Sequence, residues 1–346
     1  MRRKEPDLKS TTRAPGAAQA NRSLTGEQGG TISRDLVVAA YRSFFGREPE
    51  NEEVVKQKLE QCKSEDQLLK AFLMSPEFTR RFANYSSVVR AQYYARQNHV
   101  DVDVPEEQFD RLFSRVKEQW TALGRSEPYW SVLSDDRFRM KSMKEHEADF
   151  YASGADSDRL IDVFCQRTGV PPPKGTCLEL GCGVGRITRF LARRFDRVLG
   201  VDISEGNLKL AQSYLGKEHV NNVSWLLLRQ LEQLQELESF DFFFSILVLQ
   251  HNPPPMIARI LKIMLHKLRS GGGFLFQVPN QTPGYTFTID AYLERSNQAA
   301  TGYEMHALPM STVLDIVADA GGRVKEVMLD MLSGGYGSHT FFGIKA

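Results

Sequence analysis

The chain has 346 residues, of which 41% are hydrophobic and 25% are charged, and its formal net charge at pH 7 is +1. This composition is typical of a globular protein with room for two domains. The near-zero charge argues against a nucleic-acid partner, and no apolar run has the length of a membrane span or the form of a secretory signal. We therefore expect a cytoplasmic protein.

The cysteines are scattered along the chain and form no CxxC pair. They are Cys62, Cys165, Cys177 and Cys182. Such spacing is typical of reduced thiols that pack as small apolar groups. We expect neither a disulfide framework nor a metal site.

Residues 1–30 contain almost no large apolar side chains, so they cannot bury enough surface to offset the entropy lost on ordering. We expect a disordered tail there. Residues 31–85 instead carry four helix-start signals, which predict a compact helical domain. The helix starts are expected at Ser33, Asn51, Ser64 and the pair Ser75-Pro76.

Two stretches of this helical domain form a motif. They read YRSFFGREP at residues 41–49 and FLMSPEF at residues 72–78. Together they resemble a small helical domain of unknown function found in bacterial surface and glycan-related proteins. The resemblance implies docking to a protein partner, and we expect the aromatic residues to form its core rather than a ligand site.

Residues 86–135 contain charged amphipathic stretches, which predict helices that link the two parts of the chain. Tyr129 and Trp130, near the end of this linker, suit either core packing or the wall of a substrate cleft. A further helix is expected at residues 156–167. Residues 136–346 form the second predicted domain.

Residues 176–192, TCLELGCGVGRITRFLA, combine an apolar strand, a glycine turn and an amphipathic helix that we expect to start at Val184. Glycines permit a sharp turn and a close ligand approach, and the helix start offers N–H groups to an anion. The spacing departs from the GxGxxG of dinucleotide-binding proteins. A second apolar strand ends at Asp202, whose carboxylate can accept hydrogen bonds from both hydroxyls of a ribose.

These two motifs, ELGCGVG at 179–185 and VDIS at 201–204, resemble the first two motifs of class I S-adenosylmethionine-dependent methyltransferases. The segments at residues 240–251 and 268–278 resemble the fourth- and fifth-strand motifs of that family. The resemblance implies an α/β fold with a doubly wound, Rossmann-like sheet that is mostly parallel and has an antiparallel last strand.

The resemblance also implies S-adenosylmethionine as the cofactor. Its methionine would bind Glu179 and the glycine N–H groups, and its ribose would bind Asp202. The aspartate that most relatives place after the third strand is absent, so Gln230 or a backbone group would bind the adenine. The expected cofactor contacts are Glu179, Gly181, Gly183, Gly185, Asp202, Ile203, Gln230, Gln250 and, as a lid, Tyr151.

His251 follows the fourth strand, where a structural role or a role as general base is open. An unperturbed imidazole pKa of about 6.5 suits a base at neutral pH. The insertion at residues 279–309 carries Glu304 and His306. It is either a polar surface loop or a lid over the acceptor, in which Glu304 or His306 assists deprotonation.

The leading hypothesis is a bacterial methyltransferase that O-methylates a sugar or glycan intermediate. The glycan acceptor rests on the helical domain alone. A small natural product or a lipid is the alternative acceptor, and a non-catalytic cofactor-binding scaffold is the alternative from another class. No metal is expected, because residues 250–253 offer too few oxygen ligands.

Overall fold

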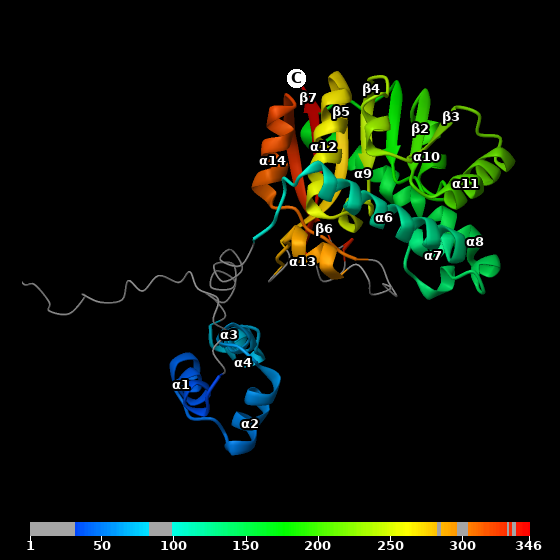
Figure 1. The fold of residues 1–346 in the computed structure, drawn as a ribbon. Coiled ribbons are helices and arrows are strands. Elements are labelled where there is room, and N and C mark those ends of the chain that lie inside the picture. Colours follow the sequence, from blue (N-terminus) through cyan, green and yellow to red (C-terminus); the bar gives the residue numbers. More distant parts are fainter. Residues whose placement is uncertain (1–31, 83–98, 282–284, 296–303, 331, 334–336) are drawn as a thin grey trace, which may run out of the picture. The chain divides into compact units, whose positions relative to one another are not determined.

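The computed structural model describes residues 32–82, 99–281, 285–295, 304–330, 332–333 and 337–346 (Figure 1). The chain divides into two compact units, residues 1–93 and 94–346. Each unit is described by itself. The predicted disordered tail, residues 1–30, lies outside the described residues.

Four helices make up the described part of the first unit. They are α1 (Arg34–Phe45), α2 (Glu52–Gln61), α3 (Glu65–Leu73) and α4 (Pro76–Arg81). Each begins at the residue that the sequence predicts, since a side-chain oxygen accepts a hydrogen bond from a backbone N–H of the first turn. The caps are Ser33, Asn51, Ser64 and Ser75.

The aromatic side chains of this unit form its core, as expected. Tyr41, Phe45 and Phe72 are almost fully buried, and the ring centroids of Tyr41 and Phe72 lie 4.8 Å apart in an edge-to-face arrangement. Gly46 ends α1 in the left-handed region, with φ of 60°.

The second unit is built on a seven-stranded sheet with the strand order β3-β2-β1-β4-β5-β7-β6 (Figure 1). The strands are β1 (Thr176–Leu180), β2 (Arg197–Asp202), β3 (Val223–Leu227), β4 (Phe240–Ser245), β5 (Leu268–Gln281), β6 (Gly322–Asp330) and β7 (Gly337–Lys345). All neighbours in the series from β3 to β5 pair in parallel, and β7 runs antiparallel to both β5 and β6. The predicted mostly parallel sheet with an antiparallel last strand is confirmed.

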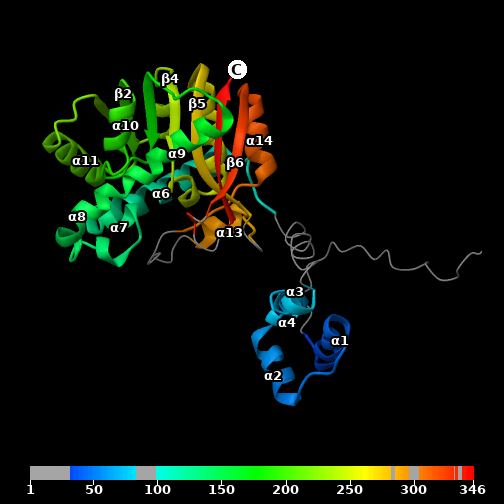
Figure 2. The same ribbon diagram turned by 180° about the vertical axis from the view of Figure 1, so that it is seen from behind.

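Helices cover both faces of the sheet. On one face α6 (Glu106–Ser126), α12 (Pro254–Lys267) and α14 (Met310–Asp319) contribute to one apolar core, which lies in front of the sheet in Figure 1. On the other face α9 (Gly154–Thr168) and α10 (Thr188–Arg194) contribute to a second core, seen in front in Figure 2. The sequence of β4 reflects this: Phe243 belongs to the first core, and Phe242 and Phe244 to the second.

The helix after the glycine turn begins at Thr188, four residues later than expected from the sequence. Gly181, Gly183 and Gly185 all have positive φ, so the chain from 181 to 187 is a turn rather than the first turn of a helix. The other α-helices in the described part of the second unit are α7 (Pro128–Val132), α8 (Met143–Ala152), α11 (Glu205–Lys217) and α13 (Ile289–Glu294).

Helix α6 comes from residues 86–135, which the sequence predicts to link the two parts of the chain, and it packs into the core of the second unit. Phe109, Leu112, Phe113 and Val116 form one buried stripe of this helix and belong to the same core as β1, β4 and α12. The stripe has the spacing of a helix that buries one face, and this face lies in the core that α6 shares with α12 and the sheet. α6 therefore belongs to the second unit.

None of the helices within the described ranges is long and apolar enough to cross a membrane. In the same ranges no group of three or more His, Cys, Asp or Glu side chains has the arrangement of a metal site. All four cysteines are buried free thiols.

Candidate active site

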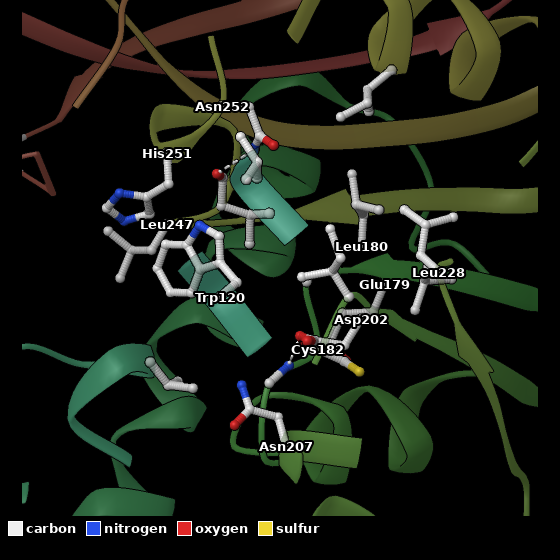
Figure 3. A pocket seen from close by; sticks show the side chains of 18 of the residues that line it. Trp120, Glu179, Leu180, Cys182, Asp202, Asn207, Leu228, Leu247, His251 and Asn252 are labelled. Carbon is white, nitrogen blue, oxygen red and sulfur yellow. Dashed lines mark hydrogen bonds between the residues drawn. The ribbon is translucent and has the colours of Figure 1, made fainter. Parts of the chain in front are cut away.

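A pocket lies at the carboxyl ends of β1, β2 and β4, beneath α6 (Figure 3). Ligands of open parallel sheets bind at this edge, because the loops that follow the strands meet there. Much of the lining comes from four of the places that meet here. They are Glu179 and Leu180 of β1, Val201 and Asp202 of β2, Ile246 to Val248 after β4, and Phe113, Val116 and Trp120 of α6.

The glycine turn after β1 forms one wall of this pocket. A Cβ atom at Gly181 would lie 2.6 Å from Val248 Cγ1, and one at Gly183 would lie 2.6 Å from Val132 Cγ2, so neither position has room for a side chain. Gly185 does not line the pocket; a Cβ there would meet Leu215 of α11 at 2.7 Å. The first two glycines thus face the pocket, and the third allows close packing of α11.

Asp202 joins the two predicted motifs. Its carboxylate is buried and accepts hydrogen bonds from the N–H groups of Gly183 and Ser204, each at 2.8 Å. Burial raises the pKa of Asp202 to about 6, although the backbone hydrogen bonds oppose this shift. Ile203 also lines the pocket, as expected.

Glu179 faces the same pocket with only 3% of its surface exposed. It accepts a hydrogen bond from Thr188 Oγ1 at 2.6 Å. Burial raises the pKa of Glu179 to about 8, against the opposing effects of Thr188 and of the nearby Arg186 charge. A cation from a ligand would favour the ionised form of this carboxyl.

Arg186 was not singled out in the sequence, although it directly follows the third glycine. The structure buries it in the pocket wall, where Nη1 donates to Ser153 Oγ and Nε has no hydrogen-bond partner among the described residues. Burial lowers the pKa of Arg186 to about 10. A buried guanidinium with an unused N–H is a ready partner for an anion.

Asn207 of α11 is a second functional candidate that the sequence did not reveal. It lines the pocket, is 3% exposed, and its Oδ1 has no partner in the described part of the chain. It is the third helical residue after Ser204, the N-cap of α11. Only the tertiary packing of α11 places it in the pocket wall. An unpaired buried amide oxygen indicates a ligand or a water in this place.

His251 lies with Trp120 and Leu247 at one end of the pocket, away from Glu179 and Asp202 (Figure 3). Its ring centroid is 5.0 Å from that of Trp120. Nδ1 lies 3.0 Å from the Glu304 carbonyl oxygen, to which it donates. Burial lowers the pKa of His251 to about 4, so the imidazole is neutral at pH 7 and a weaker base than its unperturbed pKa suggests.

The side chains of Glu304 and His306 do not line the pocket. The Glu304 carboxylate accepts hydrogen bonds from Arg115 Nη2 at 2.7 Å and from Tyr292 Oη at 2.6 Å. Burial would raise the pKa of Glu304, but hydrogen bonds from His306 and Tyr292 and the charge of Arg115 lower it to about 2. His306 Nδ1 lies 2.9 Å from Tyr285 Oη. This is the geometry of a paired structural cluster, and a catalytic role for either residue stays a prediction.

Besides Gly185, three further predicted cofactor residues lie outside the pocket lining. Tyr151 stacks on Tyr214 at a centroid distance of 3.4 Å, Gln230 is exposed at the start of a short 3-10 turn, and Gln250 is buried in a polar network behind His251. Their contacts with a cofactor stay predictions.

Residues 177–272 match the family model described as a methyltransferase domain. This segment of the chain is therefore similar to a methyltransferase domain. The match begins in β1 and ends in β5, so it includes the glycine turn, Asp202 and His251.

Curated relatives share sequence similarity with part of the chain. The chain is 28% identical over 155 residues to the ubiquinone biosynthesis O-methyltransferase of Acinetobacter baylyi, an alignment that covers 43% of this chain and 64% of the relative. It is 29% identical over 131 residues to the protein of the same name from Pseudomonas fluorescens, covering 37% of this chain and 54% of the relative. The chain thus spans less than two thirds of the length of these relatives.

Solved structures with some likeness to the chain include two methyltransferases. The magnesium protoporphyrin IX methyltransferase of Synechocystis PCC 6803 with bound SAH has a TM-score of 0.47 and 16% identity, covering 67% of this chain and 98% of that one. The N-methyltransferase NodS of Bradyrhizobium japonicum in complex with S-adenosyl-l-homocysteine has a TM-score of 0.43 and 16% identity, with the same two coverages.

Proposed function

We propose that this chain is an S-adenosylmethionine-dependent methyltransferase that methylates an oxygen of a small acceptor. The observation that carries the proposal is the pocket itself. Glu179, the first two glycines and Asp202 meet in it at the ends of β1 and β2, inside the segment that matches the methyltransferase domain. The aligned relatives are named O-methyltransferases, which supports the choice of oxygen.

The residues of the pocket fit this cofactor. A methionine moiety carries an ammonium group and a carboxylate, and the pocket offers Glu179 for the first and the unpartnered Nε of Arg186 for the second. Asp202 and Asn207 offer polar atoms to a ribose. The adenine would find the apolar residues Leu228 and Leu231 in the same lining.

The protein would contribute positioning and the removal of water. When bound, S-adenosylmethionine supplies an activated methyl group. The buried polar groups at one end of the pocket would hold the donor, and Trp120, Leu247 and His251 at the other end would hold the acceptor in a site that excludes water.

The acceptor end of the pocket favours an apolar ring with one hydroxyl. Trp120 and Leu247 present apolar surface there, and His251 is neutral at pH 7. Each hydroxyl of a sugar would need a hydrogen-bond partner on burial, and this end offers few. A small natural product or lipid-like phenol therefore suits it better than the sugar or glycan, which remains the second candidate because of the motif in the first unit.

Calorimetric titration of the chain with S-adenosylmethionine tests the proposal. We expect saturable binding at one site per chain, and weaker binding for Arg186→Met, which removes the buried cation. An absence of binding would overturn both enzyme hypotheses, the one with a small natural product or lipid as acceptor and the one with a sugar or glycan. Binding without transfer to either a phenolic or a sugar acceptor would favour the non-catalytic scaffold.

A further inference from the structure

A buried polar chain runs from β5 to His251. Gln277 of β5 has no exposed surface, and Gln250 is 4% exposed. The Leu247 N–H donates to Gln277 Oε1, and Gln277 Nε2 donates to Gln250 Oε1, both at 3.0 Å. Gln250 Nε2 lies 3.0 Å from His251 Nε2, and His251 Nδ1 lies 3.0 Å from the Glu304 carbonyl oxygen. Four links thus connect two segments of backbone.

The two ends of this polar chain fix the direction of every link. The oxygen and nitrogen of a glutamine amide, and the two tautomers of a histidine, are distinguished only by their partners. The Leu247 N–H can only donate, so Gln277 must turn its oxygen toward it and its nitrogen toward Gln250. Gln250 then presents its nitrogen to His251.

The Glu304 end of the polar chain leads independently to the same directions for these hydrogen bonds. The Glu304 carbonyl can only accept, so His251 must carry its proton on Nδ1 and accept at Nε2. An imidazole Nε2 has one lone pair, and the Gln250 amide occupies it. A hydroxyl of the acceptor could donate to Nε2 only by displacing that amide.

The polar chain also supports the loop after β4. Leu247 has φ of 63°, in the left-handed region that a non-glycine residue rarely adopts. Its N–H is held by Gln277, whose Nε2 also lies within hydrogen-bond distance of Ser333 Oγ and Ser338 Oγ. The Ser333 hydroxyl in turn donates to Gln250 Oε1 at 2.7 Å. The backbone that carries Leu247 into the pocket is therefore tied to β5 and to the start of β7.

We propose that Gln277 is a positioning residue, which holds His251 in the Nδ1-protonated tautomer through Gln250 and so fixes the imidazole wall of the acceptor end. The tautomer is a property of the ligand-free protein. The effect on turnover rests on the methyltransferase function proposed above.

Nitrogen NMR of the His251 side chain in the full chain tests the tautomer. At about pH 7 we expect a proton on Nδ1 and none on Nε2. In Gln277→Glu the carboxylate still accepts from the Leu247 N–H but cannot donate to Gln250. The Ser333 hydroxyl, which donates to Gln250 Oε1 in the wild type, then turns its one proton to this carboxylate. The Gln250 amide then turns over, its oxygen faces His251, and the proton moves to Nε2 or a second proton binds.

Two further variants complete this experiment. Ser338→Ala is the matched control, because it removes one neighbour of Gln277 Nε2 and leaves all four links in place; its His251 spectrum should equal that of the wild type. Gln250→Glu serves if Gln277→Glu does not fold, since it also replaces the donor to Nε2 by an acceptor. A wild-type His251 protonated at Nε2, or an unchanged tautomer in both glutamate variants, would overturn the proposal.

Turnover separates the positioning role from the function itself. Gln277→Glu should lower kcat by about tenfold or more, with the Kd for S-adenosylmethionine changed by less than about twofold. A shifted tautomer with unchanged kcat would overturn the positioning role alone. If the wild type transfers no methyl group, the proposed function fails while the NMR result still stands.

Discussion

At the scale of single residues, the pocket holds ionisable groups whose pKa values are shifted because burial disfavours their charged forms. The pKa of Glu179 is raised to about 8, that of Asp202 to about 6, and that of Arg186 is lowered to about 10, with desolvation as the largest cause each time. Buried groups shifted in this way are typical of binding and catalytic sites. A ligand with charges of both signs would relieve all three.

Asp202→Asn should weaken cofactor binding. The variant keeps one oxygen acceptor but loses the charge and half of the acceptor capacity that ribose hydroxyls would use. We expect the Kd for S-adenosylmethionine to rise by about tenfold or more, equivalent to about 1.4 kcal/mol. Asp315→Asn, on the exposed side of α14, is the control. Equal Kd values for Asp202→Asn and the control, measured by calorimetry, would contradict the assignment.

Glu179 predicts how the ligand-free protein responds to pH. Its folded-state pKa, about 8, lies above the unfolded value of 4.5, so the folded chain holds this proton more tightly. The resulting stability is fully present below about pH 4.5 and is lost as pH rises through about 8. Glu179→Gln should therefore gain stability relative to the wild type over this range.

Urea denaturation at several pH values measures this gain. The exposed Glu147→Gln is the matched control and should follow the wild type at every pH. Parallel stability curves for the wild type and Glu179→Gln would show that Glu179 does not titrate in this window.

The lowered pKa of His251 predicts that kcat does not follow the titration of this imidazole at neutral pH. Burial lowers its pKa to about 4, outweighing the hydrogen bond to Glu304 that raises it, and the charge of His306 lowers it further. The imidazole stays neutral above about pH 5, so log kcat should show no inflection at about pH 6.5, where an unperturbed histidine titrates. An inflection there that disappears in His251→Asn would mean that His251 titrates as the base.

At the scale of elements, α6 is the part of the site that the sequence analysis placed in a linker between two domains. Its apolar stripe was visible, but nothing in a single sequence says which surface a stripe covers. The helix crosses α11 closely at Gly124, where a Cβ atom would lie 2.9 Å from Ser204 Cβ and nearer still to its Oγ. Because the two helices cross closely, α6 lies over the end of β2 and forms one wall of the pocket.

Replacing either of two helical glycines by alanine should therefore change the stability of the protein, in opposite directions for the two positions. Gly216→Ala in α11 adds a methyl group in open space and should stabilise the protein by about 0.5–1 kcal/mol through helix propensity. Gly124→Ala in α6 meets Ser204 and should destabilise it by about 1–3 kcal/mol despite the same propensity gain. Denaturation midpoints measure both, and stabilisation by Gly124→Ala would mean that the crossing of α6 and α11 is loose.

At the scale of the whole molecule, the sequence predicts local features well and burial poorly. The helix caps at Ser33 and Asn51 and the strand that ends at Asp202 were predictable, because each rests on a few consecutive residues. Arg186 and Asn207 were missed because their importance comes from being buried in the pocket wall. The same applies to His251, whose position was predicted and whose lowered pKa was not.

The measurement that tests the central claim most directly is methyl transfer from isotopically labelled S-adenosylmethionine to matched acceptors. A panel of monohydroxylated aromatic compounds and of sugars of similar size would be presented to the wild type and to Asp202→Asn. We predict that label appears on the oxygen of an aromatic acceptor, with one S-adenosylhomocysteine formed for each methyl transferred, and that Asp202→Asn is slower. Cofactor binding with no S-adenosylhomocysteine formed on any acceptor would contradict the account.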